Sequence, residues 1–395
     1  MKAIGVIAEY NPFHLGHARH LTWIKNQHPE IPVIVAMSGA MTQRGELAYV
    51  DKWTRAEAAI RAGADLVVTL PTVHSLSSAE HFGRAGVQLL THLQVDALSF
   101  GVETNKTEEL ITLASKIDTL SVQEALKEEL KSGAPYGTAL RKALIALSPN
   151  YEDIVSTPNN SLALSYLRTA LQEAPSMTFL PLERNSDHHN EEEQSFPSGT
   201  FLRKCLDNGH SILPYLAPSS KDLFLQAIEE NRIVDIQRYR DLLLITGRLK
   251  SCDELTSIAG FVEGIEQRWK KAFALPNYTE TLQYVKTKRF TFSSLQRMTA
   301  AMLLGITKEK QMALFDVGPS YAQLLAYSSL GKKYIKENTF SIPLITKWAP
   351  FYRQSEGFVK ESLDIDRKAQ DLQQYCFKNP SYRQGGMDFM KHPIG

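Results

Sequence analysis

The sequence lacks paired cysteines and long apolar runs. Its three cysteines, Cys205, Cys252 and Cys376, are scattered singly, so neither a disulfide framework nor a cysteine-pair metal site is expected. Apolar stretches such as residues 3–8 are far shorter than a membrane span, which needs roughly 20 residues, or the apolar part of a secretion signal. We therefore expect a cytoplasmic protein that does not contact the membrane.

An excess of charge of either sign is also missing. The 44 Lys and Arg residues nearly balance 43 Asp and Glu residues, for a net charge of +1. A surface that binds nucleic acid would therefore have to arise from local segregation of charge. Because 43% hydrophobic and 22% charged residues are ordinary values for folded proteins, composition leaves the function open.

The first hundred residues alternate apolar runs with amphipathic segments. We predict strands at residues 4–7, 33–37, 66–70 and 95–100, with helices between them at about residues 18–26, 52–62 and 78–91. This alternation indicates an α/β fold with a Rossmann-like, doubly wound parallel sheet. Ligands of such sheets bind at the carboxyl ends of the strands.

The remainder reads as mostly helical. Helical periodicity dominates from about residue 214, with few strand signals before residue 340. We predict three domains: an α/β domain at residues 1–212, a helical domain at 213–340 and an extension at 341–395. We expect residues 385–395 to fray.

The segment Glu-Tyr-Asn-Pro-Phe-His-Leu-Gly-His at residues 9–17 lies between the first strand and the first helix. His14 and His17 at a helix N-terminus can donate hydrogen bonds to phosphate oxygens, and Gly16 allows a nucleotide to approach the backbone. The alternative is that both histidines only cap a helix. The flanking strand and helix favour a nucleotide site. No third ligand at a suitable spacing accompanies the histidines, so we predict no metal site.

A second phosphate-binding motif is predicted at residues 198–203. Ser198 and Thr200 can bind the β- and γ-phosphates, and Arg203 can neutralise the leaving pyrophosphate. A helix cap followed by a solvated arginine is the alternative.

A third polar segment follows the second strand and should open onto the same edge of the sheet. Gln43, Arg44, Asp51, Lys52 and Arg55 could bind a nucleotide or an acyl acceptor, and we count Asp51 and Lys52 among the candidate catalytic residues. Equally, Asp51 could cap the next helix and Arg55 could lie on its wet face.

These motifs together resemble the bacterial tRNA(Met) cytidine acetate ligase family of the HIGH-motif nucleotidyltransferases. The matching segments are residues 5–17, 37–39, 43–45, 50–53, 70–71, 100–103 and 157–160. The resemblance implies that acetate and ATP form acetyl-adenylate and pyrophosphate, and that the acetyl group then passes to the exocyclic amine of the wobble cytidine of elongator tRNA(Met). Because acetate is its own nucleophile, the first step needs alignment and stabilisation of charge at phosphorus more than a general base. His14, His17 and Arg203 would supply that stabilisation.

The resemblance also implies which residues bind ATP. They are Ile7, Ala8, Glu9, Tyr10, Asn11, Pro12, Phe13, His14, Leu15, Gly16, His17, Ala18, Arg19, His20, Gly101, Asn159, Asn160 and Arg184, to which the second motif adds Ser198 and Thr200. The asparagine pair could instead cap a helix. Mg²⁺ is the expected counterion of ATP, although no dedicated carboxylate pair demands it.

Basic residues outnumber acidic ones between residues 266 and 310, and Phe290 and Phe292 lie among them. We predict that the tRNA contacts are Lys286, Lys288, Arg289 and Arg297, since phosphate contacts and base stacking are what loop recognition requires. A solvated helical face is the alternative. Three positions depart from the family pattern: Val102 replaces a small polar residue, and arginines are missing at Ser294 and near Gln323.

Two other functions fit parts of the sequence. A small-molecule nucleotidyltransferase, such as one that adenylates a cofactor precursor, would explain the histidines but not the basic segment. A non-catalytic RNA-binding protein on the same fold is the third reading. The sequence indicates no obligate protein partner and identifies no general base for acetyl transfer.

Overall fold

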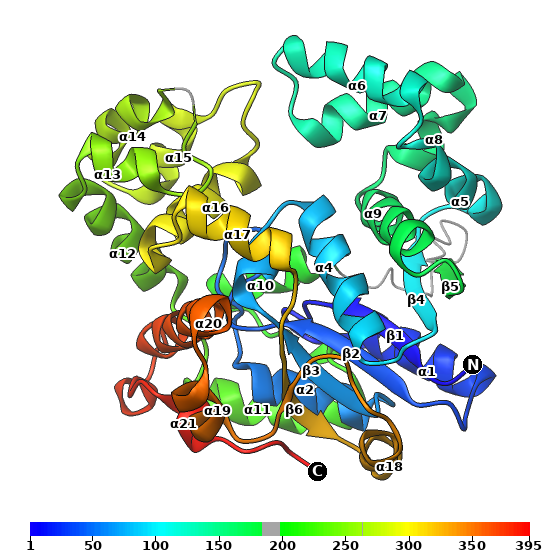
Figure 1. The fold of residues 1–395 in the computed structure, drawn as a ribbon. Coiled ribbons are helices and arrows are strands. Elements are labelled where there is room, and N and C mark those ends of the chain that lie inside the picture. The colour runs from blue at the N-terminus through cyan, green and yellow to red at the C-terminus, as the bar shows by residue number, and fades with distance from the viewer. Residues whose placement is uncertain (184–197, 263) are drawn as a thin grey trace.

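A seven-stranded sheet forms the centre of the molecule (Figure 1). The computed structural model describes residues 1–183, 198–262 and 264–395. The strands lie in the order β5-β4-β1-β2-β3-β6-β7. Their bounds are Ile4–Ala8 for β1, Val33–Ser38 for β2, Leu66–Leu70 for β3, Ala97–Val102 for β4, Thr178–Glu183 for β5, Ala322–Tyr327 for β6 and Leu344–Ile345 for β7.

The four strands predicted in the first hundred residues are confirmed, and β1 to β5 are mutually parallel. Strand β1 lies between β2 and β4, so the strand order reverses beside β1. The carboxyl ends of β1 and β4 therefore form the switch point at which doubly wound sheets bind ligands.

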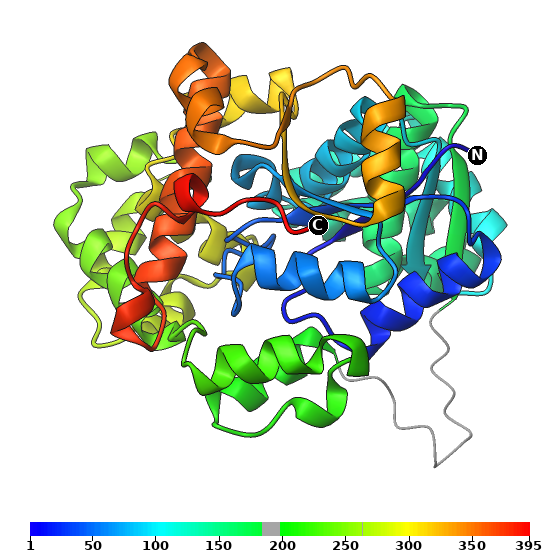
Figure 2. The same cartoon turned by 90° about the horizontal axis from the view of Figure 1, so that it is seen from below.

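Helices cover both faces of this sheet (Figures 1 and 2). One core packs beneath α4 (Ala79–His92) and α9 (Pro158–Glu173). The other lies against α1 (Leu15–Gln27), α2 (Lys52–Arg61), α10 (Gly199–Asp207) and α11 (Lys221–Glu229). The predicted helices at residues 18–26, 52–62 and 78–91 correspond to α1, α2 and α4.

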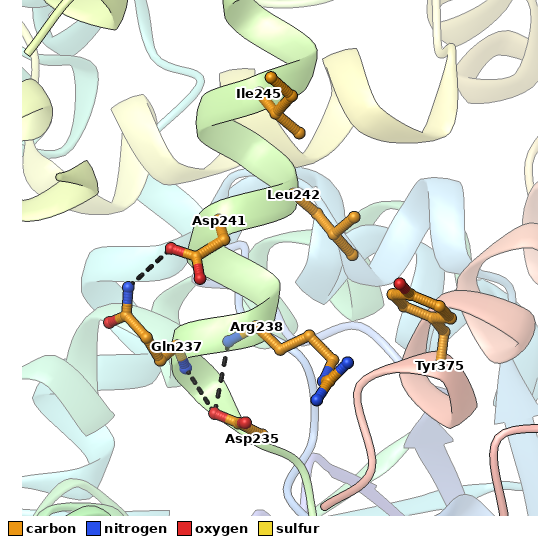
Figure 3. Close-up of a pocket in the computed structure, with 7 residues that line it drawn as sticks. All are labelled: Asp235, Gln237, Arg238, Asp241, Leu242, Ile245 and Tyr375. Atoms are coloured by element: carbon orange, nitrogen blue, oxygen red, sulfur yellow. Dashed lines mark hydrogen bonds between the residues drawn. The ribbon is translucent and has the colours of Figure 1, made fainter. Parts of the chain in front are cut away.

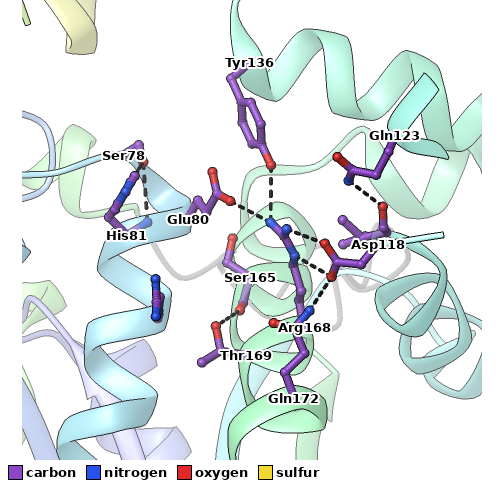
Figure 4. Close-up of polar contacts among 12 residues, drawn as sticks. Ser78, Glu80, His81, Asp118, Gln123, Tyr136, Ser165, Arg168, Thr169 and Gln172 are labelled. Atoms are coloured by element: carbon purple, nitrogen blue, oxygen red, sulfur yellow. Dashed lines mark hydrogen bonds and ion pairs between the residues drawn. The ribbon is translucent and has the colours of Figure 1, made fainter. Parts of the chain in front are cut away.

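A helical arm of α5 (Thr107–Lys116), α6 (Leu120–Lys131) and α7 (Tyr136–Leu147) joins α4 and α9 through Arg168 (Figure 4). The Arg168 guanidinium on α9 pairs with Asp118 before α6 and with Glu80 on α4, at 2.5 and 2.6 Å. It also donates to the Tyr136 hydroxyl at 3.3 Å. One arginine thus connects four segments that are distant in sequence.

A separate core forms in the basic, helical part of the chain. It involves α12 (Ile236–Leu249), α14 (Ile265–Phe273), α15 (Tyr278–Val285), α16 (Phe292–Leu304) and α17 (Lys308–Val317). A side chain at Gly247 would lie 2.4 Å from the Phe273 ring, so α12 and α14 approach closely because this position has none. The loop after β2 adds Ala40, Met41 and Leu47 to this core, which joins it to the sheet.

The chain then returns to the sheet. Strand β6 pairs antiparallel with β3 and is the one strand that the structure adds to the described part of residues 214–340, where few strand signals were expected. Five of its six residues are apolar, and so short a run has no period that separates a buried strand from a helix. The domain boundaries at 212 and 340 stay a prediction, although β6 lies in the sheet of the first predicted domain.

The C-terminal segment is also ordered. It contains α18 (Ser329–Glu337), α19 (Trp348–Gln354), α20 (Gly357–Tyr375) and α21 (Met387–Met390). The expected fraying is contradicted, because the Tyr327 amide donates to Ile394 at 2.8 Å and the last residues lie beside β6 (Figure 2). Within the described residues, none of the helices combines the length and the apolar character needed to cross a membrane.

The C-terminal segment is joined to the sheet by a buried ion pair. Lys52 at the start of α2 lies 2.6 Å from Asp388 on α21, and the two side chains are 2% and 1% exposed. Gln323 on β6 accepts a second hydrogen bond from Lys52 at 2.7 Å, and the rings of Trp53 and Trp348 flank the ammonium. These contacts bring together residues that are 271 and 336 positions apart in the chain.

We predict that Asp388→Ala lowers the free energy of unfolding by about 3–5 kcal/mol, because it leaves the Lys52 ammonium buried without its carboxylate. Equilibrium urea unfolding measures the change. Asp222→Ala is the control, since it removes an exposed partner of Arg61 and should cost less than about 1 kcal/mol. Equal effects of the two variants would contradict the prediction.

Candidate active site

The two histidines form a capping box at the start of α1. The Gly16 amide donates to His14 Nδ1 at 3.1 Å, and the His14 amide donates to His17 Nδ1 at 3.3 Å. The rings stack with centroids 3.7 Å apart. Because a neutral imidazole that accepts at Nδ1 carries its proton on Nε2, this arrangement presents each Nε2–H as a donor. Capping and phosphate binding are therefore compatible.

The turn that precedes the histidines contains two buried polar groups that no described residue pairs with. Tyr10, at φ 51°, and Phe13 pack against His17, with ring centroids 4.8 and 5.7 Å away. Within the described part of the chain, neither the Tyr10 hydroxyl nor Asn11 Nδ2 has a hydrogen-bond partner. Asn11 Oδ1 is occupied by the Tyr49 amide at 2.9 Å. Unpaired buried polar groups are costly, so this turn has the character of a ligand site.

The second predicted motif lies against the first. Ser198 caps α10 by accepting from the Phe201 amide at 3.2 Å. Arg203 donates to the Asn11 carbonyl at 2.9 Å and to the Thr200 hydroxyl at 3.1 Å. A Cβ at Gly199 would lie 3.2 Å from the Asn11 oxygen, a tight contact, so glycine favours the close approach of the two segments. The structure thus joins two motifs separated by almost 200 residues.

Arg55 shapes the loop after β2. Its guanidinium donates to the backbone carbonyls of Glu9, Ser38, Gly39 and Val50. Burial lowers the pKa of Arg55 to about 10, against the opposing effects of Asp51 and Glu9. Arg55 is fully buried, which contradicts a position on the wet face of α2. It remains charged at neutral pH.

The same loop faces the histidine turn. The Gln43 amide donates to Glu9 Oε1 at 2.6 Å. Glu46 lies 3.6 Å from Arg203 Nε and accepts from Gln296 on α16 at 3.2 Å. Glu46 and Gln296 were not predicted as site residues, and their spacing in the sequence gives no signal for them.

Asp51 and Lys52 make other contacts. Asp51 accepts from the Thr54 amide at 2.9 Å, as an N-cap, and pairs with Arg232 at 2.6 Å. Lys52 pairs with Asp388. None of their described hydrogen bonds and ion pairs reaches His14, His17 or Arg203. Their catalytic role stays a prediction, and the contacts observed fit a structural role.

The remaining ATP candidates lie on β1, on α1 and around β4. Ile7 and Ala8 end β1, Pro12 lies in the turn, and Leu15, Ala18, Arg19 and His20 belong to the first turns of α1. His20 Nε2 lies 2.7 Å from the Ser99 hydroxyl of β4, the strand that also contains Gly101.

The asparagine pair lies at the start of α9. Asn160 is fully buried; it accepts from the Glu103 amide and donates to Ile154, both at 2.8 Å. Asn159 donates to the Glu103 carboxylate at 2.6 Å. Asn160 therefore stabilises the turn after β4, whereas the half-buried Asn159 remains closer to solvent. Arg184 lies outside the described residues.

The predicted tRNA contacts divide into two groups. Lys288 and Arg289 are exposed, and the Lys286 ammonium lies 5.6 Å from the Phe292 ring. Arg297 is largely covered and donates to the Gln43 carbonyl at 3.2 Å, while burial lowers its pKa to about 10. Arg297 therefore connects α16 to the loop at the histidine site.

A pocket of about 410 Å³ lies elsewhere, between α12 and the end of α20 (Figure 3). Its lining includes Arg238 and Tyr375 but none of the predicted site residues. No group of three or more His, Cys, Asp or Glu side chains in the described part of the chain could hold a metal ion.

Paired histidines at a helix N-terminus, beside an arginine at the switch point of a parallel sheet, define a HIGH-type nucleotidyltransferase. A family model described as HIGH Nucleotidyl Transferase matches residues 1–388. The chain is 32% identical to the tRNA(Met) cytidine acetate ligase of Acetivibrio thermocellus, with 100% of both chains covered. It is 34% identical to the ligase of the same name from a Geobacillus species, over 90% of this chain and 92% of the relative.

A solved structure agrees with these similarities. Thermotoga maritima TmcAL, bound with alpha-thio ATP, superposes with a TM-score of 0.91 at 30% identity, and the match covers 100% of this chain and 99% of that one. The chain belongs to the tRNA(Met) cytidine acetate ligase family.

We predict that Arg203→Gln weakens ATP binding by about 10- to 100-fold, since charge-assisted hydrogen bonds contribute about 1.5–3 kcal/mol. Isothermal titration with a non-hydrolysable ATP analogue measures the change. Lys204→Gln is the matched control, because its exposed side chain lies on the next residue of α10. Similar affinities for wild type and Arg203→Gln would contradict this role.

Proposed function

We propose that this protein is an ATP-dependent ligase that activates acetate and acetylates the wobble cytidine of elongator tRNA(Met). The observation that supports this function best is the contact of Arg203 with Asn11, in the turn that leads into His14 and His17, in a member of this ligase family. Since its substrate would be a tRNA, the cytoplasm is the proposed site of action.

In the first step an acetate oxygen attacks the α-phosphorus of ATP, and pyrophosphate leaves with the electrons of the broken P–O bond. The Nε2–H groups of His14 and His17 and the N-terminus of α1 would stabilise charge on the α-phosphate. Arg203, with the Ser198 and Thr200 hydroxyls, would bind the leaving pyrophosphate. This step requires alignment rather than a proton acceptor, because acetate is already ionised.

In the second step the cytidine amine attacks the acetyl carbonyl of the adenylate, and AMP leaves. The acetyl-adenylate must be protected from water until the cytidine arrives. Helix α16 supports this geometry, since Gln296 and Arg297 contact the loop that faces the histidine turn. Lys286, Lys288 and Arg289 would then bind phosphates of the tRNA farther from the reacting atoms.

We predict that incubation with ATP, labelled acetate and bacterial tRNA gives labelled N4-acetylcytidine, and that His17→Ala lowers the rate by about 100-fold or more. Nucleoside analysis by mass spectrometry measures the product. Reactions without ATP and without tRNA are the controls.

The other outcomes separate the remaining functions. Formation of acetyl-adenylate without labelled tRNA would support the activation of acetate and refute tRNA as the acceptor. Neither product, with ATP still bound, would refute acetate as substrate and favour a small-molecule nucleotidyltransferase. If the wild-type protein does not bind ATP, the result would favour a non-catalytic RNA-binding protein.

Each lysine that binds a tRNA phosphate should contribute to the salt dependence of the affinity for tRNA. We predict that Lys288→Ala weakens tRNA binding and reduces the slope of log affinity against log salt by about one, because one phosphate contact is lost. Lys332→Ala is the matched control, since this exposed lysine lies on α18, far from α16 (Figure 1). Filter binding at several salt concentrations measures the slope for each variant. Equal slopes for Lys288→Ala and Lys332→Ala would exclude Lys288 from the tRNA-binding surface.

A further inference from the structure

The proposed second step needs a group that accepts a proton. As the cytidine amine attacks, the new N–C bond forms, the C–O bond to AMP breaks, and the amine nitrogen must lose one proton. General bases typically accelerate such steps by about 10²–10⁴-fold. A suitable group must lie between the adenylate and the surface from which cytidine enters.

Most ionisable groups described at the site are already committed. The Nδ1 atoms of His14 and His17 accept backbone amides, which places protons on their Nε2 atoms. Both oxygens of Glu46 are engaged, one by Gln296 and the other by Arg203. Asp207 accepts from the Tyr49 hydroxyl and lies exposed at the C-terminal end of α10, the end opposite to Ser198. None of these side chains is arranged to accept the proton.

Glu9 is different. Its Oε1 accepts the Gln43 amide at 2.6 Å, and no hydrogen bond from another described residue reaches its carboxylate. Arg55 holds the Glu9 backbone through its carbonyl at 2.7 Å. The residue is therefore fixed at its backbone and at one oxygen, and the second oxygen is left to contact a substrate.

The position of Glu9 also suits a group that accepts a proton between the adenylate and the incoming cytidine. Glu9 ends the run from β1 into the histidine turn, where the adenylate is expected. The backbone of Gln43 connects Glu9 to helix α16. The Gln43 amide donates to the Glu9 carboxylate, and the Gln43 carbonyl accepts from Arg297 of α16. The carboxylate thus lies between the nucleotide motif and the proposed tRNA element.

We propose that Glu9 is the general base of acetyl transfer: its Oε2 accepts the proton from the cytidine amine as the amine attacks the acetyl carbonyl and AMP leaves. This assignment rests on the proposed function.

Charge and burial around Glu9 agree with that task. Burial raises the pKa of the Glu9 carboxyl above its ordinary value, although the Gln43 hydrogen bond, Arg203 and Arg44 act in the opposite direction. The carboxylate of Glu46 raises the pKa further. A base with a raised pKa is closer to the operating pH, which favours proton transfer.

The test compares the two half-reactions in Glu9→Gln. Acetate-dependent exchange of pyrophosphate into ATP reports the first step, and single-turnover transfer from added acetyl-adenylate to tRNA reports the second. We expect the ratio of transfer rate to exchange rate to fall by about 100-fold or more. Glu9→Asp, which keeps a carboxylate, should recover part of the loss. Glu229→Gln, on the exposed face of α11, is the matched control.

The wild-type pH profile provides an independent test. Transfer should decline as the pH falls through the raised pKa of Glu9, and this acid limb should disappear in Glu9→Gln. Equal losses of exchange and transfer would overturn the proposal and indicate that Glu9 binds the nucleotide or its counterion. An unchanged ratio, or an acid limb that persists in Glu9→Gln, would overturn it as well. Absence of acetate-dependent exchange in the wild type would instead refute the proposed function.

Discussion

The organisation of the active site depends on the buried guanidinium of Arg55. It donates to four backbone carbonyls, which belong to the end of β1, the end of β2 and the loop between β2 and α2. Without a donor, these carbonyls would lie unsatisfied in a region from which water is largely excluded, and each would cost about 1–3 kcal/mol. Arg55 therefore fixes the distance between the histidine turn and the loop that faces it. The contacts of Glu9, Gln43 and Glu46 all depend on that distance.

The sequence was sufficient for the parts of the fold that repeat a local pattern. Strands β1 to β4 and helices α1, α2 and α4 follow from apolar periodicity, and the histidine motif could be placed because it lies between two of them. Strand β6 could not be placed, because its mostly apolar residues gain their partner from β3, more than 250 residues earlier in the chain. The docked C-terminus was missed for the same reason, since its partners are β6 and Lys52.

Individual site residues show the same limit. Lys52 reads from sequence as a polar residue in a ligand loop, yet Asp388 compensates its charge inside the protein. Arg55 reads from sequence either as a ligand-binding residue or as a solvated helix residue, although carbonyl groups from three segments surround it. Arg203 could be assigned to phosphate binding from its motif, but its position beside the histidine turn depends on the contact with Asn11, almost 200 residues earlier in the chain. In each case the deciding partner is distant in the chain, and local propensity has no information about it.

The nearly balanced charge at the site affects how the protein selects its substrates. Two of the three proposed substrates, ATP and tRNA, are polyanions, but a net charge of +1 provides little long-range attraction for either. Arg203, Arg44 and Arg297 supply positive charge locally, and Glu9 and Glu46 offset much of it in the same loop region. A strongly positive cleft would bind any nucleic acid and would hold pyrophosphate and AMP after reaction. A nearly balanced site must instead select its substrates by the placement of hydrogen-bond donors, which is what the rigid frame around Arg55 provides.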